Sequence, residues 1–328
     1  MPISIVMPTY NGMPYVKQAV ESVLQQSCQD WELIISDDGS EDGTREYLAT
    51  IEDRRIQVHQ QEKNLGIFGN LNFLFRHVSY GITQILCQDD YFFDGGALQR
   101  LTEEWAKLPA DVSFLRCNHD PGNANSVLSA FEREVLPERI DPQVSDIYFA
   151  VFGCIPGNLS NVSVRSEAVV RAGWFRPDLP YAGDFEFWSR LGRVSPWALS
   201  QAKTTVVRSH DGQASHFLNL RGELLPQMRT VLETVYPHAV AAGAHASWLR
   251  LLMTVNYVAQ HKDRGLKGVV LQRDATYLRR AMQEFDQGTF AYGPFLSWLV
   301  FFGSLGGRAF RVTIARRLLE KTVAAPAA

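Results

Sequence analysis

The chain has 328 residues, of which 46% are hydrophobic and 20% are charged, so it can bury a large core as one elaborated domain or two joined domains. Its formal net charge of -3 excludes a protein that binds nucleic acid through overall charge. The four cysteines lie far apart without Cys-x-x-Cys spacing, which argues against a zinc site and a disulfide framework and fits a reducing cytoplasm.

The N-terminal sequence MPISIVMPTYN lacks a basic segment followed by a long apolar one, so it indicates a first strand and not a signal peptide. β-Branched runs predict strands at Ile3–Met7, Trp31–Ser36, Ile56–His59 and Ile82–Cys87. Apolar residues at helical spacing predict helices between them, at Pro14–Gln26, Thr44–Ile51 and around Leu71–Val78. This alternation predicts an α/β fold with a mostly parallel sheet and right-handed crossovers.

The alternation continues with a predicted strand and short helix between Gly153 and Phe175, and it stops near Leu220. Beyond that point apolar residues recur at helical spacing, which predicts helices packed on the preceding domain. The segment Phe290–Gly307 contains no charged residue and approaches the minimum length of a membrane span. Because it contains Pro294 and several glycines, we expect it to lie at a membrane interface or to form a buried helix.

A basic tail follows this apolar segment. It carries one acidic residue, Glu320, and five basic residues: Arg308, Arg311, Arg316, Arg317 and Lys321. A basic amphipathic segment beside an apolar one suits an anionic membrane surface. A hydrophobic contact within an oligomer is the alternative interpretation.

Polar clusters follow three of the predicted strands. Pro8–Asn11 (PTYN) follows the first strand, Asp37 and Asp38 follow the second, and Asp89 and Asp90 follow the fourth. Each cluster alone is more simply a turn or a helix cap. However, the carboxyl ends of parallel strands meet at one edge of the sheet, where ligands bind, so three clusters there favour a common ligand.

Adjacent carboxylates at one edge repel each other, and a divalent cation that bridges phosphates would offset this repulsion. Mg²⁺ and Mn²⁺ take one or two protein carboxylates, with water and phosphate oxygens as the remaining ligands. The chain has neither GxxxxGK[ST] nor a GxGxxG after its first strand, which excludes the P-loop and the dinucleotide fingerprint. The expected ligand is therefore a metal–nucleotide.

Five stretches, in this order, resemble an inverting family 2 glycosyltransferase of the GT-A fold: ISIVMPTYNGMPYVKQAVESVLQQS, WELIISDDGSEDGT, NLGIFGNLN, QDDYFFDGGALQRL and GDFEFWSRLGR. The resemblance covers about residues 2–215. It implies a GT-A type α/β fold with a mostly parallel central sheet and a helical C-terminal region. The implied catalytic domain is 1–218, with a nucleotide-binding half at about 1–110 and an acceptor-side half at about 111–218, and the helical region is 219–328.

The resemblance also implies roles for single residues. It assigns the nucleotide sugar to Pro8, Thr9, Tyr10, Asn11, Asp38, Asn64, Gly66, Asn72 and Asp89. Within that set, PTYN would line the nucleoside pocket and Asp38 would contact the base. Asp90 would end the DxD element and bind Mn²⁺ or Mg²⁺, and Asp184 would be the general base. The alternative for Asp184 is a helix N-cap.

Three positions depart from the family pattern. The usual D-x-D-D element is CQDD here, with Cys87 in place of the first Asp. In N-x-G-x-x-x-A-R-N, Asn70 and Leu71 replace Ala-Arg, which brings the chain nearer to a rhamnosyltransferase-like subset. The Glu that often precedes the base is Gly183. Outside the family motifs, His210 is a candidate metal ligand or acceptor contact, although an isolated His is more often structural or solvated.

The resemblance implies metal-dependent transfer of a sugar, with inversion, from a nucleoside-diphosphate sugar to an acceptor hydroxyl. Asp184 would accept the hydroxyl proton, and a cation at Asp90 would stabilise the leaving diphosphate. UDP- or dTDP-sugars are the favoured donors, and a glycan or lipid-linked glycan is the expected acceptor in bacterial surface-polysaccharide assembly. The expected location is the cytoplasm or the inner face of the cytoplasmic membrane.

Two other functions remain open from the sequence. A non-catalytic nucleotide-sugar-binding module would keep the fold without transfer, and the loss of the first DxD Asp at Cys87 is compatible with it. A sugar nucleotidyltransferase would share the cleft topology, but the Gly-rich, Arg-containing loop after the first strand is absent.

Overall fold

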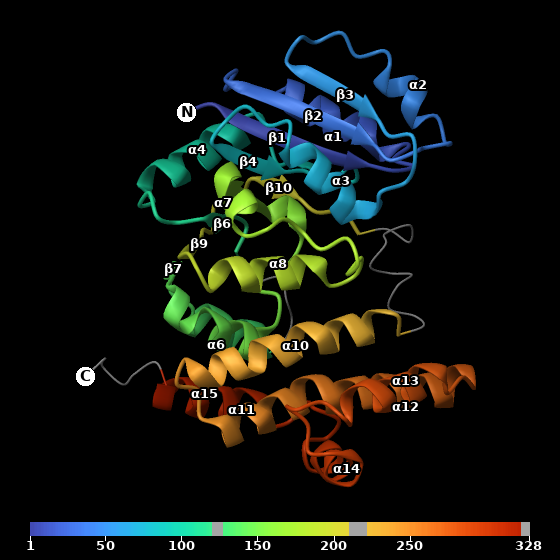
Figure 1. Ribbon diagram of the computed structural model, residues 1–328, viewed down its shortest axis with the longest axis vertical. Helices are drawn as coiled ribbons and strands as arrows, with labels where there is room; N and C mark the ends of the chain where they lie inside the picture. Colours follow the sequence, from blue (N-terminus) through green and yellow to red (C-terminus); the bar gives the residue numbers. More distant parts are fainter. Residues whose placement is uncertain (120–126, 210–221, 323–328) are drawn as a thin grey trace. The chain divides into compact units, whose positions relative to one another are not determined.

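The computed structural model describes residues 1–119, 127–209 and 222–322. The chain forms two compact units (Figure 1). The first comprises Met1–Asp120, Pro137–Asp141 and Pro156–Ser209; the second comprises Pro121–Leu136, Pro142–Ile155 and His210–Ala328. The chain therefore contributes two short segments to the second unit before its C-terminal part. The division at residue 218 stays a prediction.

A mixed eight-stranded sheet forms the centre of the first unit. Its strands are β1 (Ile3–Thr9), β2 (Trp31–Asp37), β3 (Ile56–Gln60), β4 (Ile82–Ile85), β6 (Phe114–Arg116), β7 (Arg139–Ile140), β8 (Val162–Arg165) and β9 (Trp197–Leu199). Their spatial order is β3-β2-β1-β4-β8-β6-β9-β7. The β3-β2-β1-β4 half is parallel, as is the β6–β9 pair, whereas β8 and β7 pair antiparallel with their neighbours. A mostly parallel sheet is confirmed.

The central strands are buried on both faces because helices flank the sheet. Every residue of β1 and β2 is buried, which explains their continuous apolar runs in place of an alternating pattern. The helices of this unit are α1 (Tyr15–Leu24), α2 (Thr44–Leu48), α3 (Gly66–Phe75), α4 (Ala97–Lys107), α7 (Ser166–Arg171) and α8 (Gly183–Gly192). The predicted strand and short helix between Gly153 and Phe175 are confirmed as β8 and α7.

Helix α3 begins earlier than its apolar spacing indicates. The sequence predicts a helix around Leu71–Val78, whereas the structure begins it at Gly66. The carboxylate of Asp38 accepts the backbone N–H groups of Leu65 and Gly66, at 2.7 and 2.9 Å. A cap supplied from another part of the chain therefore sets the start of this helix.

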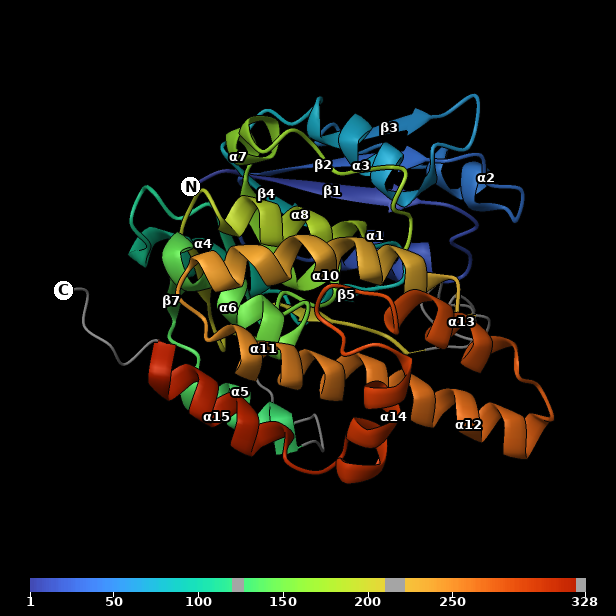
Figure 2. The same cartoon turned by 60° about the horizontal axis from the view of Figure 1, so that its bottom comes forward.

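The second unit is helical. Its elements are α5 (Val127–Val135), α6 (Pro142–Phe152), α10 (Leu224–Ala241), α11 (Ala246–Met253), the π-helical turn η3 (Thr254–Ala259), α12 (Gln260–Gln272), α13 (Thr276–Phe285), α14 (Pro294–Gly303) and α15 (Arg311–Thr322). Helices α11, η3 and α12 continue from one to the next along one rod (Figure 2). The predicted helices are confirmed, and within the described ranges no helix has the length and apolarity to cross a membrane.

The start of α8 lies unusually close to α3. A Cβ at Gly183 would lie 2.6 Å from Cε2 of Phe68, so only glycine fits without movement of that ring. The Phe68 ring in turn stacks on Phe175, whose own ring stacks on Phe187 of α8 with centroids 3.9 Å apart. This aromatic packing holds the first turn of α8, which carries Asp184, against α3.

We expect Gly183→Ala to lower the free energy of unfolding by roughly 1–3 kcal/mol, because overpacking forces a buried ring to move. Urea unfolding measures this effect. In the Gly183→Ala/Phe68→Leu double variant the smaller side chain relieves the clash, so the two losses should be clearly less than additive. Additive losses would contradict the direct contact.

Candidate functional site

The loop after β1 and the turn after β4 are joined by one side chain. The amide of Gln88 accepts from the backbone N–H of Tyr10 at 2.7 Å and donates to the carbonyl of Tyr10 at 2.8 Å. A Cβ at Gly12 would lie 2.7 Å from Oε1 of Gln88, so glycine permits this approach. The PTYN loop and the CQDD turn therefore form one edge, as the strand order predicts.

The same loop is also tied to the segment after β2. The backbone N–H of Asn11 donates to Oγ of Ser40 at 2.8 Å, and Oδ1 of Asn11 accepts from the N–H of Glu41 at 2.9 Å. Asn11 has a left-handed φ of 47°, a conformation that asparagine tolerates better than most residues. Pro8 and Thr9 are buried at the end of β1, whereas the side chain of Tyr10 is 50% exposed and available to a ligand.

Asp38 lies at this edge, with its carboxylate already engaged. Its oxygens accept the N–H groups of Leu65 and Gly66, and Nδ2 of Asn64 donates to its carbonyl at 3.1 Å. Burial raises the pKa of Asp38, and the two N–H donors oppose that rise. Each carboxylate oxygen retains a second lone pair, so the base contact implied by the family stays a prediction.

Asn72 is placed differently from the other predicted nucleotide-binding residues. Its Nδ2 donates to the carbonyl of Phe175 at 2.8 Å, and its Oδ1 accepts from the N–H of Phe175 at 2.9 Å. The residue is 7% exposed. This reciprocal pair joins α3 to the segment before α8, and the predicted role of Asn72 in nucleotide binding is not tested by it.

Asp90 is the most deeply buried carboxylate of the CQDD turn, at 1% exposure. Its Oδ1 accepts from the backbone N–H of Arg208 at 3.0 Å. Its Oδ2 is buried and accepts no hydrogen bond from the described part of the chain. Burial, with a contribution from the Asp89 charge, raises the pKa of Asp90 to about 6, although the Ser160 hydroxyl and Arg208 lower it. Among the described residues, Oδ2 of Asp90 thus has no hydrogen-bond donor.

Arg208 is a site residue that the sequence did not reveal. Its Nη1 donates to the carbonyl of Asp89 at 2.5 Å, and its Nη2 donates to Oε1 of Gln18. The guanidinium lies over the rings of Tyr91 and Tyr15, 4.6 and 5.1 Å from their centroids. It therefore holds a positive charge beside the acidic turn.

The position of Arg208 depends on a short strand that the sequence hardly predicts. Arg208 follows β10 (Thr205–Val206), which pairs antiparallel with β5 (Tyr91–Phe92) directly after the acidic turn. This pairing returns the chain to Asp89 and Asp90, and a two-residue strand gives little periodicity from which to predict it. His210, the candidate predicted from the same stretch, lies outside the described residues.

Asp184 lies in the first turn of α8, after the N-cap position Ala182. Its Oδ1 accepts from the N–H of Phe185 at 2.7 Å, and a carboxylate is favourable at a helix N-terminus. Its side chain is partly exposed, but the surrounding protein is dense enough for burial to raise its pKa to about 6. Asp184 is therefore not the N-cap residue of α8.

The thiol of Cys87 is affected by the charges of Asp89 and Asp90 in its own turn and of Asp184 at the start of α8. Burial raises the pKa of its thiol well above the usual range, and the charges of Asp90, Asp89 and Asp184 add to that rise. Its backbone N–H donates to Oγ of Ser160 at 2.9 Å. Cys87 is thus a neutral group within reach of three carboxylates, where the family's usual Asp would add a fourth negative charge.

The donor set fits a hard cation that the substrate helps to bind. Within residues 1–119, 127–209 and 222–322 no three His, Cys, Asp or Glu side chains form a metal cluster. Asp90 nevertheless offers a buried oxygen without a donor, and Mg²⁺ or Mn²⁺ typically takes one or two carboxylates plus phosphate oxygens. A cation at this edge would therefore depend on a phosphate ligand for stable binding.

Comparison with known proteins finds a family match within the N-terminal part of the chain. Residues 4–152 match the model described as Glycosyl transferase family 2. The Escherichia coli protein named UDP-Glc:alpha-D-GlcNAc-diphosphoundecaprenol beta-1,3-glucosyltransferase WfgD is 30% identical over 138 residues, which is 42% of this chain and 52% of that protein. The chain thus spans about half the length of that curated relative.

Solved structures with the same fold cover nearly the whole chain. S. aureus TarS 1-349 in complex with UDP-GlcNAc gives a TM-score of 0.64 at 15% identity, over 98% of this chain and 91% of that one. The mannosyltransferase PcManGT from Pyrobaculum calidifontis, in complex with GDP-Man and Mn²⁺, gives 0.53 at 15% identity, over 96% and 86%. These likenesses confirm the predicted GT-A type fold with its helical C-terminal region.

We expect Asp184→Asn to raise the free energy of unfolding at pH 7.5 by roughly 1–2 kcal/mol, because it removes a charge that burial penalises. The sign follows from the raised pKa: the folded state binds the Asp184 proton more tightly than the unfolded state, so wild type loses stability as pH rises from about 4 to about 6. The gain from Asn should therefore shrink as pH falls below 6. Urea unfolding across this range measures it.

Asp178→Asn is the matched control on the loop before α8. Arg176 pairs with this exposed carboxylate and lowers its pKa, so the variant should lose a little stability at neutral pH and gain none. An Asp184→Asn effect that does not change with pH would contradict a buried, ionised carboxylate.

Proposed function

Because residues 4–152 match the model of glycosyl transferase family 2, we propose that the protein transfers a sugar, with inversion, from a nucleoside-diphosphate sugar to an acceptor hydroxyl. One observation carries the proposal: a carboxylate in the CQDD turn and a carboxylate at the start of α8 lie in different environments. Asp90 is buried with an oxygen that accepts no hydrogen bond from the described residues, and Asp184 is partly exposed at the start of a helix. Metal-dependent transfer of this kind needs both.

Asp184 supplies the proton acceptor in this proposal. As the acceptor hydroxyl oxygen bonds to the anomeric carbon, the bond from that carbon to the diphosphate oxygen breaks, and the hydroxyl proton moves to Asp184. A pKa of about 6 leaves Asp184 mostly ionised at neutral pH yet more basic than an ordinary carboxylate. The hydrogen bond that the N–H of Phe185 donates to Oδ1 holds this carboxylate in place at the start of α8.

Asp90 would hold the cation that stabilises the negative charge of the leaving group, and Arg208 holds Asp90 in position. Mn²⁺ or Mg²⁺, when bound through Asp90, supplies Lewis-acid stabilisation of the departing diphosphate. Arg208 holds the backbone of the turn through the carbonyl of Asp89 and the carboxylate of Asp90. Its backbone N–H contacts the Asp90 carboxylate, and the packing of its guanidinium over two tyrosine rings keeps Arg208 in place for this contact.

The related proteins support the class of donor and acceptor. TarS 1-349 was crystallised in complex with UDP-GlcNAc, and the name of WfgD gives UDP-Glc as donor and a diphosphoundecaprenol-linked sugar as acceptor. We therefore extend the proposal to a UDP-sugar donor and a lipid-linked glycan acceptor in surface-polysaccharide assembly. The rhamnosyltransferase-like subset has no support from these relatives.

The products of the reaction test the function. Incubation of the purified full chain with a UDP-sugar, Mn²⁺ and a lipid-linked glycan should release UDP and extend the glycan. Release of pyrophosphate from a sugar phosphate and UTP would instead identify a nucleotidyltransferase. Donor binding without any product, across UDP-, dTDP- and GDP-sugars, would identify a non-catalytic binding module.

Asp184→Asn should lower turnover by roughly 10²- to 10⁴-fold while donor affinity stays nearly unchanged, because a general base acts on the chemical step. Steady-state rates and calorimetric UDP titrations measure the two quantities. Asp178→Asn should keep normal turnover. If Asp184→Asn kept normal turnover, the residue would have only a structural role in the first turn of α8.

Asp90→Ala should abolish the gain in UDP affinity that Mn²⁺ produces, because the diphosphate would lose the cation that offsets its charge against the acidic edge. Calorimetric titration of UDP with and without Mn²⁺ measures this gain. Asp89→Ala should have a milder effect, since the carbonyl of Asp89 that receives Arg208 is kept in the alanine variant. Equal Mn²⁺ enhancement in wild type and Asp90→Ala would exclude Asp90 as the metal ligand.

A further inference from the structure

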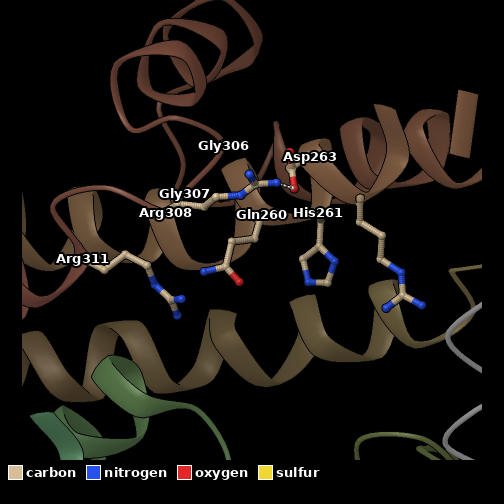
Figure 3. A pocket seen from close by; sticks show the side chains of 8 residues that line it. Gln260, His261, Asp263, Gly306, Gly307, Arg308 and Arg311 are labelled. Carbon is tan, nitrogen blue, oxygen red and sulfur yellow. Dashed lines mark hydrogen bonds and ion pairs between the residues drawn. The ribbon is translucent and has the colours of Figure 1, made fainter. Parts of the chain in front are cut away.

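A cavity of about 310 Å³ in the second unit is rich in arginine. It lies between α12 and the loop that joins α14 to α15 (Figure 3). Arg264, Arg308 and Arg311 line it, against a single carboxylate, Asp263. His261 also lines it, but burial and the Arg264 charge lower its pKa to about 4, so it is neutral at physiological pH. The lining therefore carries an excess of positive charge.

The partners of these arginines leave most of that charge available. Arg308 donates to Oδ2 of Asp263 at 2.8 Å, but Lys267 shares the same carboxylate oxygen at the same distance. The single negative charge of Asp263 therefore neutralises only one of these two cations. Arg264 lies over the ring of Tyr277, 5.1 Å from its centroid, which is a neutral partner.

Arg311 has neutral partners as well. Its Nε donates to Oδ1 of Asn256 at 2.8 Å, and its Nη1 lies 2.8 Å from the amide of Gln260 once that amide is oriented to accept. Figure 3 shows the Gln260 and Arg311 side chains next to each other. Burial lowers the pKa of Arg311, which indicates a cation held in a partly dry site. An anionic ligand would stabilise the charged guanidinium of Arg311 through charge-assisted hydrogen bonds.

The loop that carries Arg308 packs closely against η3 and α12. A Cβ at Gly307 would lie 2.6 Å from the carbonyl oxygen of Val255, and a Cβ at Gly306 would lie 3.1 Å from Asp263. Gly306 and Gly307 have left-handed φ values, 68° and 81°. The arginines are therefore brought together by the folded backbone and not by flexible side chains alone.

Exposed apolar residues lie close in sequence to the residues that line this cavity. Its members are large side chains that are mostly solvent-exposed: Phe295 at 74%, Leu296 at 47%, Leu299 at 54%, Phe302 at 67%, Leu305 at 70% and Phe310 at 63%. The opposite side of α14 packs inward through Phe301, which is 8% exposed, and through Trp298, whose ring lies 4.6 Å from Nζ of Lys262. We call the six exposed residues the α14 face.

We propose that the α14 face enters an anionic lipid surface and that the arginine cavity binds the phosphate of a lipid headgroup there. Leu305 and Phe310 flank Arg308, so apolar and cationic groups alternate over the same loop. Apolar side chains flanked by cations match the acyl boundary and the phosphate layer of a membrane. Free phosphate would account for the arginines but not for six exposed apolar side chains. This inference is independent of the proposed function.

Vesicle binding by the purified full chain tests the apolar part. Wild type should co-sediment with vesicles of phosphatidylcholine and phosphatidylglycerol, and much less with phosphatidylcholine alone. Phe295→Ser/Phe302→Ser should weaken binding at least about tenfold, because two exposed aromatic groups lose their insertion into the bilayer. The matched control is Val270→Ser/Leu271→Ser, at side chains of α12 that are 76% and 78% exposed; it should bind as wild type does.

A second pair of variants tests the cavity. Arg308→Gln should weaken binding to the anionic vesicles about fivefold and Arg264→Gln by a similar factor, since each cation near such a surface contributes about 1 kcal/mol. Arg279→Gln, at an exposed arginine on α13, should have less effect. Millimolar inorganic phosphate should not release the wild type, which separates a headgroup from a free-phosphate site.

Several outcomes would overturn the proposal. Equal binding to neutral and anionic vesicles, equal losses in the α14 variant and its control, or full release by inorganic phosphate would each do so. Light scattering provides a further check: if Phe295→Ser/Phe302→Ser converts an oligomer to a monomer, a second copy of the chain covers the α14 face and the proposal is wrong. Sedimentation requires no sugar transfer, so failure here would leave the proposed function intact.

Discussion

Negative charge buried at the carboxyl end of the sheet is the constraint on which the candidate site depends. Asp90 is almost fully buried beside Asp89, and like charges about 4 Å apart near protein repel by roughly 4 kcal/mol. The fold opposes this repulsion with the backbone N–H and the guanidinium of Arg208. It also places the neutral thiol of Cys87 where a further carboxylate would increase the repulsion. The remaining imbalance favours a cation.

The same burial prepares the two key carboxylates for different tasks. Both Asp90 and Asp184 have a pKa near 6, and in each case burial is the main cause. Their surroundings differ, because Asp90 is buried in a turn with one oxygen that accepts no hydrogen bond from the described residues, whereas Asp184 is partly exposed in the first turn of a helix. Perturbed carboxyl groups with distinct environments are typical of functional sites. Burial of these carboxylates therefore both lowers the stability of the folded state at neutral pH and raises the pKa values on which the proposed chemistry depends.

The second unit has an excess of positive charge at its cavity, whereas the first unit has an excess of negative charge at the end of its sheet. The arginines that line its cavity contact neutral side chains or share the carboxylate of Asp263, so positive charge stays available at the arginine cavity. Where a cation is fully buried, at Lys262, the unit supplies its own partner, Asp286, at 2.8 Å. The contrast indicates that the cationic excess beside the α14 face is a property of that location and not of the whole unit.

The sequence by itself determined part of the fold: the parallel βα alternation of the first four strands, the helices beyond residue 220, the short strand and helix before Phe175, and the polar clusters at strand ends. These follow from side-chain periodicity and turn residues, which act between neighbours in the chain. The motifs also carried the family resemblance. Strand ends were less certain, since β4 ends at Ile85 and not at Cys87.

Only the tertiary structure decided how those clusters are held. Asp38 caps α3 through the N–H of Leu65, 27 residues later, Gln88 binds the backbone of Tyr10 across 78 residues, and Arg208 reaches Asp90 across 118. The close approach of Gly183 to Phe68 is likewise absent from any local pattern. Such contacts form because the strands bring distant loops to one edge, and a hydrogen bond or a ring contact depends on the final positions of both partners, which periodicity along the chain does not encode.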